Sequence, residues 1–180
     1  AGHSGCARKP LKIAHIQGSG QISPYVNQKV TTQGIVTDAA IMTHGFWIQS
    51  EISQHEALSS DALMVTLKTD PLPKQGDRVV VSGVVRELSH GNNLPVTFIL
   101  ADDVRILAAH QALPRAVIIR HVPDQSVIEA IGFWEALEGM RVRINDAKVV
   151  ATIDMFAQTV MLAPGNQAAG SGFVAKENLL

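Results

Sequence analysis

The chain has 180 residues, of which 46% are apolar, and a formal net charge of −1 from 15 basic and 16 acidic residues. This length suits one large or two small domains, and the apolar fraction is ample for a packed core. The charge excludes the strongly basic balance of an autonomous DNA binder, whose affinity comes mainly from neutralising phosphates. Cys6 is the only cysteine, so no disulfide can form within the chain. No run of 18 apolar residues occurs, so the sequence predicts no membrane span.

The first 110 residues predict a lead-in followed by a β-barrel. Residues 1–10 are typical of a flexible, basic lead-in. Glycines inside strands, such as Gly83, mark places where a strand of a small barrel bends sharply. The Asp102–Asp103 pair is expected to mark a turn between the last two strands. Alternating and β-branched runs between turn residues predict extended segments at 11–16, 29–40, 45–50, 62–68, 78–88, 96–100 and 104–107.

The remaining residues, 111–180, predict a second and smaller unit. One helix is expected over 126–137, with Asp124 or Ser126 as its cap and Gly139 ending it. Its shared apolar face would consist of Val127, Ile128, Ile131, Trp134 and Leu137. Strands are expected at 116–120, 141–144, 147–153 and 159–162, with no closing strand after them. The predicted fold class is therefore all-β with one main helix: an OB-fold-like barrel over 11–110, then a partial β unit over 111–180.

Several motifs give the chain a family resemblance. They are His15-Ile-Gln-Gly-Ser-Gly-Gln-Ile-Ser-Pro24, Gly45-Phe-Trp-Ile-Gln49 and Gly76-Asp-Arg-Val79. Over residues 13 to 107 the chain resembles the oligonucleotide/oligosaccharide-binding (OB) domain of secreted bacterial nucleases. In that family the OB domain precedes an endonuclease/exonuclease/phosphatase catalytic domain. The resemblance implies an extracellular or periplasmic accessory module, with a catalytic nuclease domain downstream as its partner.

Trp47 and Gln49 are the first candidate nucleic-acid contacts. If Phe46 and Ile48 fill the barrel, strand alternation places Trp47 and Gln49 on the outer face. An exposed aromatic on an OB sheet is a stacking platform for a base. The alternative is that Trp47 belongs to the core or packs under the 51–61 loop.

Basic residues on or beside the predicted strands are the second set of candidates. Lys68 and Arg86, with Lys29 and Arg105, could line a groove for a phosphate backbone. The alternative is that they are solvated strand edges, where charge prevents unwanted pairing.

No set of residues in the sequence indicates catalysis. Nucleophile-elbow, phosphate-loop and dinucleotide-binding motifs are missing from the sequence. The histidines in predicted loops lack the spacing of metal ligands and are expected to be surface residues: His44, His55, His90 and His110. The prediction is a non-enzyme with no catalytic residue, no metal and no small-molecule cofactor.

Two functions remain open from the sequence. In the first, the chain is an accessory module that holds DNA or RNA weakly near a tethered catalytic domain. In the second, it is a structural or protein-interaction module that scaffolds the catalytic domain without touching nucleic acid. The OB resemblance favours the first, and the near-neutral charge favours the second.

Overall fold

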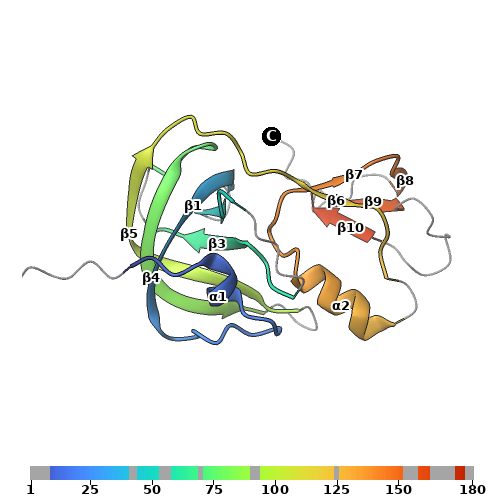
Figure 1. Cartoon of the computed structure of the whole chain (residues 1–180), viewed down its shortest axis with the longest axis horizontal. Helices are drawn as coiled ribbons and strands as arrows, with labels where there is room; N and C mark the ends of the chain where they lie inside the picture. Colours follow the sequence, from blue (N-terminus) through green and yellow to red (C-terminus); the bar gives the residue numbers. More distant parts are fainter. Residues whose placement is uncertain are drawn as a thin grey trace, which may run out of the picture.

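Five strands close into a barrel in the first part of the chain (Figure 1). The structure is a computed structural model that describes residues 9–40, 44–52, 58–68, 71–89, 94–123, 126–151, 158–162 and 173–176. The barrel strands are β1 (Lys29–Ala40), β2 (Gly45–Gln49), β3 (Ala62–Thr66), β4 (Arg78–Leu88) and β5 (Val96–Ala108). They run in the order β1-β2-β3-β5-β4, and β4 pairs with β1 to close the barrel. Only β3 and β5 pair in parallel; the other barrel neighbours are antiparallel. This is the five-stranded architecture of an OB-like barrel, and it confirms the predicted fold class.

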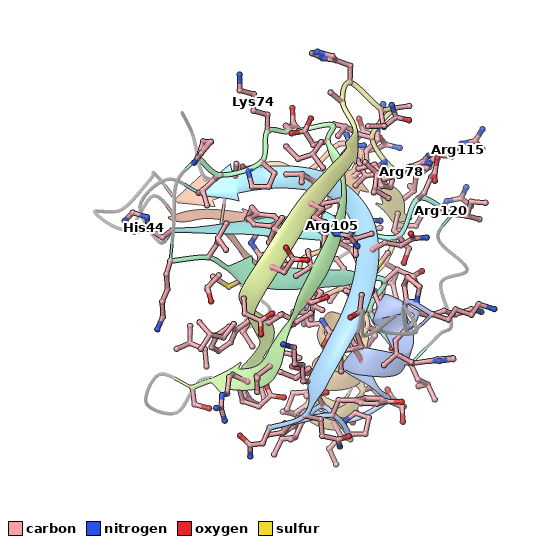
Figure 2. All side chains as sticks on the ribbon, turned by 90° about the vertical axis from the view of Figure 1, so that its left-hand side faces the viewer. His44, Lys74, Arg78, Arg105, Arg115 and Arg120 are labelled. Carbon is pink, nitrogen blue, oxygen red and sulfur yellow. The ribbon has the colours of Figure 1, made fainter. Side chains whose placement is uncertain are left out.

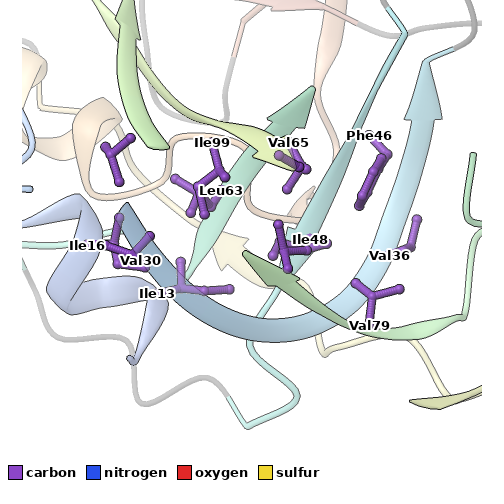
Figure 3. Packing of buried hydrophobic residues seen from close by; sticks show 13 residues of the cluster. Ile13, Ile16, Val30, Val36, Phe46, Ile48, Leu63, Val65, Val79 and Ile99 are labelled. Atoms are coloured by element: carbon purple, nitrogen blue, oxygen red, sulfur yellow. The ribbon is translucent and has the colours of Figure 1, made fainter. Parts of the chain in front are cut away.

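The barrel interior is filled by β-branched and other aliphatic side chains (Figure 3). On β2, Phe46 and Ile48 are completely buried beside Val65 and Leu63, their register partners on the neighbouring strand β3. Strand alternation puts every second residue of each strand into this interior. Because aromatic residues make up only 4% of the chain, branched aliphatic side chains fill most of the barrel interior.

Gly83 allows β4 and β5 to approach closely at a β-bulge. A Cβ atom at Gly83 would lie 2.3 Å from the carbonyl oxygen of Leu100. Ser82 pairs with Asp103 and Gly83 pairs with Ala101, so Asp102 is the extra residue of the bulge. The expected turn at Asp102–Asp103 is therefore wrong: β5 continues through both residues, because a bulge absorbs the bend without breaking the strand.

The expected extended segment at 11–16 is also wrong over most of its length. Leu11 forms one isolated bridge with Thr32, and then α1 (Ile13–Gln17) begins. Its short length hides the helical period in the sequence, but Ile13 and Ile16 are one helical turn apart and both enter the barrel core. Gly18, with φ of 75°, ends the helix.

The second part of the chain forms a smaller α and β unit beside the barrel (Figure 1). Its elements are β6 (Val117–Ile119), α2 (Val127–Glu135), β7 (Val142–Ile144), β8 (Lys148–Ala151), β9 (Gln158–Leu162) and β10 (Phe173–Lys176). β6 and β7 pair in parallel, and β8, β9 and β10 form a separate antiparallel sheet. The sequence did not predict β10. We call residues from 111 onward the C-terminal unit.

The predicted main helix is confirmed, but its apolar face is only partly buried. Ser126 caps α2, and its side-chain oxygen accepts a hydrogen bond from the backbone N–H of Glu129 at 3.4 Å. Trp134 packs against a small buried cluster that contains Leu137. Val127 and Ile128 are instead 76% and 82% exposed. The predicted face is wrong for these two residues because the cluster covers only the C-terminal end of the helix.

Candidate nucleic-acid interface

Trp47 lies on the outer face of the barrel, as strand alternation predicts. β2 pairs with β3 so that Trp47 stands opposite Met64 and Gln49 opposite Ala62. Phe46 and Ile48 point the other way, into the core. The surface formed by β2 and β3 is the one that OB folds use for oligonucleotides. We call it the β2–β3 face.

The C-terminal unit covers this face around Trp47. Gly139 follows α2 with a left-handed φ of 66°, and a Cβ atom there would lie 2.1 Å from Cζ3 of Trp47. The indole ring therefore lies directly against the Gly139 backbone, and only glycine leaves room for it. We call residues 136–141 the covering turn. Trp47 therefore packs against this turn, which occupies the part of the β2–β3 face beside the indole ring.

Gln49 serves as an internal anchor for the covering turn. Its side chain is completely buried, and its Oε1 accepts a hydrogen bond from the backbone N–H of Arg141 at 3.0 Å. Its Nε2 is buried without a hydrogen-bond partner in the described part of the chain. Leaving a buried donor unpaired costs about 1–3 kcal/mol, so the burial of Gln49 is not free. Gln49 thus lies on the outer face of the barrel, as predicted, but it is buried beneath the covering turn.

Further polar contacts join the covering turn to α1 and β3. Gln17 Nε2 donates to the Ala62 carbonyl at 2.7 Å and to Oε1 of Glu138 at 3.0 Å. The Ser60 hydroxyl donates to the Glu138 carbonyl at 2.6 Å. One small apolar cluster lies beside them, formed by Ala62 of the barrel with Ile119, Val122, Leu137 and Met140 of the C-terminal unit. Gln17 thus bridges the barrel and the covering turn with a single amide group.

Three carboxylates meet near this contact. Burial raises the pKa of Glu138 to about 7, and the charges of Glu135 and Glu87 add to the increase. Hydrogen bonds from Gln17 and the Thr97 backbone lower that pKa by less than the burial raises it. The pKa of Glu135 is raised as well, mainly by burial and then by Glu87. Glu87 itself accepts hydrogen bonds from the backbone N–H of Ser23 at 2.8 Å and from the Thr97 hydroxyl.

Two of the predicted basic residues form ion pairs with aspartates. Lys29 pairs with Asp102 at 2.5 Å, and Arg105 pairs with Asp103 at 3.5 Å. Arg86 is exposed and donates to the Asn27 side-chain oxygen. Exposed ion pairs contribute little stability. They do place a negative charge beside Lys29 and beside Arg105.

Lys68 and Arg86, the other two candidates, are not neighbours. Strand β5 lies between them: Arg86 of β4 is paired with Phe98 of β5, and Phe98 is paired with Met64 of β3. Met64 is itself four residues before Lys68 along the chain. Lys68 is exposed just beyond the end of β3. In Figure 2, His44 lies on the left and Arg105 near the centre, while Arg78, Arg115 and Arg120 lie together on the right.

The described residues offer no metal centre. Among them, no group of three or more His, Cys, Asp or Glu side chains could hold a metal ion. His44 and His110 are exposed at turns, whereas His55, His90 and Cys6 lie outside the described residues. Of the helices searched within the described ranges, none is long and apolar enough to cross a membrane.

Of the residues that define the interface between the two units, the sequence singled out Trp47 and Gln49 as candidates but not Gln17, Glu138 or Arg141. Glu138 and Gln17 stand 121 positions apart, and although Gln17 lies within the 15–24 motif, nothing in the sequence pairs the two residues. Gly139 was predicted only as the end of a helix. The available signal was the strand alternation that placed Trp47 and Gln49 on the outer face. If such a glutamine is buried there, its amide group needs a hydrogen-bond partner.

Comparison with known proteins bears on the C-terminal unit only. A family model described as a domain of unknown function (DUF8508) matches residues 109–178. The match begins directly after β5 and spans β6 to β10. A search of curated proteins finds no match.

Proposed function

We propose that this chain is a non-catalytic structural module of a secreted, nuclease-type protein, in which the barrel carries the C-terminal unit on its β2–β3 face. In this role the face packs against protein and does not bind DNA or RNA. The module would hold a neighbouring catalytic domain in an extracellular or periplasmic enzyme. This is the scaffold function that the sequence left open, and the nuclease context is carried by the family resemblance alone.

The observation that carries the proposal is the packing of the covering turn on Trp47 and Gln49. Trp47 lies against Gly139, and Gln49 is completely buried with its amide oxygen bound to the Arg141 backbone. The two best candidates for base contacts are therefore used within the chain. Pairing of Lys29 and Arg105 with aspartates supports the same conclusion, because phosphate binding needs cations that are free to replace counterions.

An oligonucleotide titration tests the proposal. Labelled single-stranded DNA and RNA, longer than the roughly 4–16 nucleotides that one OB fold covers, would be followed by fluorescence anisotropy in weakly acidic buffer at low salt. We expect no saturable binding by the whole chain. The substitutions Lys68→Ala and Arg86→Ala should leave the anisotropy at the same baseline.

Salt-dependent binding would contradict the scaffold function. If affinity falls as salt rises and Lys68→Ala or Arg86→Ala flattens that dependence, these cations contact phosphates. The nucleic-acid-binding accessory function would then be the better explanation. Circular dichroism of each variant would confirm that the strands remain intact.

A further inference from the structure

The small β6–β7 sheet has one face packed within the C-terminal unit and one face open. The two strands pair in parallel, with Ile118 opposite Arg143. Ile119 is buried in the small apolar cluster, and Val117 and Ile144 pack against the same cluster. Because neighbouring side chains on a strand point to opposite faces, Ile118 lies on the other side of the sheet, where it is 50% exposed.

An open face is unusual for strands that pair in parallel. Parallel sheets are almost always covered on both faces. β6 and β7 have only three residues each, so they depend on packing for their stability. Figure 1 shows α2 below the two strands, and its Trp134 packs against the cluster that covers their inner face. The exposure of Ile118 on the outer face favours a second protein surface that completes this packing.

Three arginines surround Ile118 on the open face. Arg143 stands directly opposite it in the neighbouring strand. Arg120 lies two residues after Ile118, and strand alternation therefore places it on the same face. By the same alternation Arg141, two residues before Arg143, belongs to this face as well. Arg115 adds a further cation, and Figure 2 shows it on the same side of the molecule as Arg120. We call Ile118, Arg120, Arg141 and Arg143 the arginine face.

The charges of this face are not neutralised within the described part of the chain. The guanidinium of Arg141 donates to the Pro114 carbonyl, and Nε of Arg143 donates to the side-chain oxygen of Asn145 at 2.9 Å. These acceptors are neutral. Among the described residues, no arginine of the face forms an ion pair, whereas two cations of the barrel pair with aspartates. The face therefore presents three positive charges that are able to bind carboxylates or phosphates.

We propose that the arginine face is the surface through which this module holds its neighbouring domain, and that the partner surface is acidic with an apolar side chain at its centre. Ile118 decides between the two kinds of anion, because an acidic protein surface also offers an apolar contact, whereas a phosphate backbone does not. Arginine and apolar side chains are the usual pairing at the centre of protein–protein interfaces. The inference rests on the scaffold function and names the surface that performs it.

A designed acidic peptide tests the proposal with the whole chain. In a short fluorescein-labelled peptide, glutamate and leucine alternate at every second position with serine between them, so an extended peptide presents both on one face. Anisotropy titrations would compare it with three probes: the same peptide with lysine for glutamate, the same peptide with serine for leucine, and single-stranded DNA. We expect saturable binding of the glutamate–leucine peptide that weakens as salt rises. The lysine peptide and the DNA should not bind, and the serine peptide should bind more weakly.

Matched variants locate the binding site. The double substitution Arg120→Ala and Arg143→Ala should weaken peptide binding by about two- to twentyfold, as two exposed ion pairs would contribute. Ile118→Ser should weaken it by about threefold or more through lost apolar contact. The controls are Arg105→Ala and Ile106→Ser on β5, whose side chains are 66% and 56% exposed and should not affect binding. Circular dichroism would verify that each variant keeps its strands.

The outcomes separate this surface from the scaffold function. If the glutamate–leucine peptide does not bind, or binds equally well to the arginine-face and control variants, the docking surface is refuted and the covered β2–β3 face still supports the scaffold function. Equal binding of the serine peptide shows a purely electrostatic contact and refutes the proposed apolar centre. Saturable DNA binding that the double arginine variant abolishes assigns the face to phosphates, which overturns the acidic partner and contradicts the scaffold function too.

Discussion

The barrel and the C-terminal unit bury their apolar residues in different ways. The barrel has a continuous core to which all five strands and α1 contribute. The described cluster of the C-terminal unit has five buried residues, and one of them, Ala62, belongs to barrel strand β3. No residue of α2 itself is buried. The barrel therefore has a core of its own, whereas this part of the C-terminal unit completes its core on the barrel surface.

This difference explains why the β2–β3 face is covered. The C-terminal unit needs an apolar and hydrogen-bonding surface, and the barrel supplies Ala62, Trp47 and Gln49. A face that serves as the floor of a second core is not available to a ligand at the same time. Three substitutions test the comparison, starting with the one expected to have the largest effect.

Phe46→Ala should break the barrel core. Phe46 is completely buried, and truncation of a buried aromatic costs about 3–5 kcal/mol through lost burial and the cavity left behind. Urea denaturation followed by circular dichroism would measure the change in the free energy of unfolding. The control is Ile106→Ala on β5, where the side chain is 56% exposed and the loss should be small. Similar losses for the two variants would show that the barrel core is not the dominant source of stability.

Gly139→Ala should separate the two units. The new Cβ would meet the Trp47 ring at 2.1 Å, and a left-handed φ of 66° is unfavourable for alanine. We expect a loss of about 2–3 kcal/mol, toward the upper end of what overpacking costs. An increased exposure of Trp47 to quencher should accompany it.

The matched control for that variant is Gly132→Ala. Gly132 lies in α2, and a Cβ atom added there would have no atom within 4 Å, so alanine should stabilise the helix by up to about 1 kcal/mol. If both substitutions destabilise the chain equally, the contact of Gly139 with Trp47 is not what joins the units.

Ile128→Ala should have the smallest effect. Its side chain is 82% exposed at the start of α2, and surface substitutions usually change stability by less than about 0.5 kcal/mol. Leu137→Ala, from the same predicted face but only 6% exposed, should cost about 2 kcal/mol or more. Thermal unfolding of the two variants would compare them directly. A large loss at Ile128 would indicate that the first turn of α2 packs against something in solution.

The sequence predicted local features well where one residue pattern has one structural solution. Strand alternation placed Phe46 and Ile48 inside and Trp47 outside, and this is what the structure has. Ser126 predicted the start of α2 because a serine side chain there satisfies a free backbone N–H group. The prediction failed for α1, where five residues are too few to separate a helical period from an extended one.

The candidate site could not be predicted to the same degree. Trp47 and Gln49 were correctly placed on the outer face, but nothing in their surroundings along the chain indicates Gly139 or Arg141 as partners. Likewise, the aspartates that pair with Lys29 and Arg105 come together through strand pairing and the bulge at Asp102. The sequence alone does not show whether a basic residue has a carboxylate beside it in the folded chain.

By itself, the sequence determined the β-barrel, most of its strands and the helix of the C-terminal unit, because these depend on the period of apolar residues and on turn chemistry. Only the tertiary structure decided that the β2–β3 face is covered and that Glu138 is held against α1. The physical reason is that these contacts join residues far apart in the chain, such as Gln17 with Glu138. Their free energies depend on burial and on neighbouring charge, which exist only after the two units have packed together.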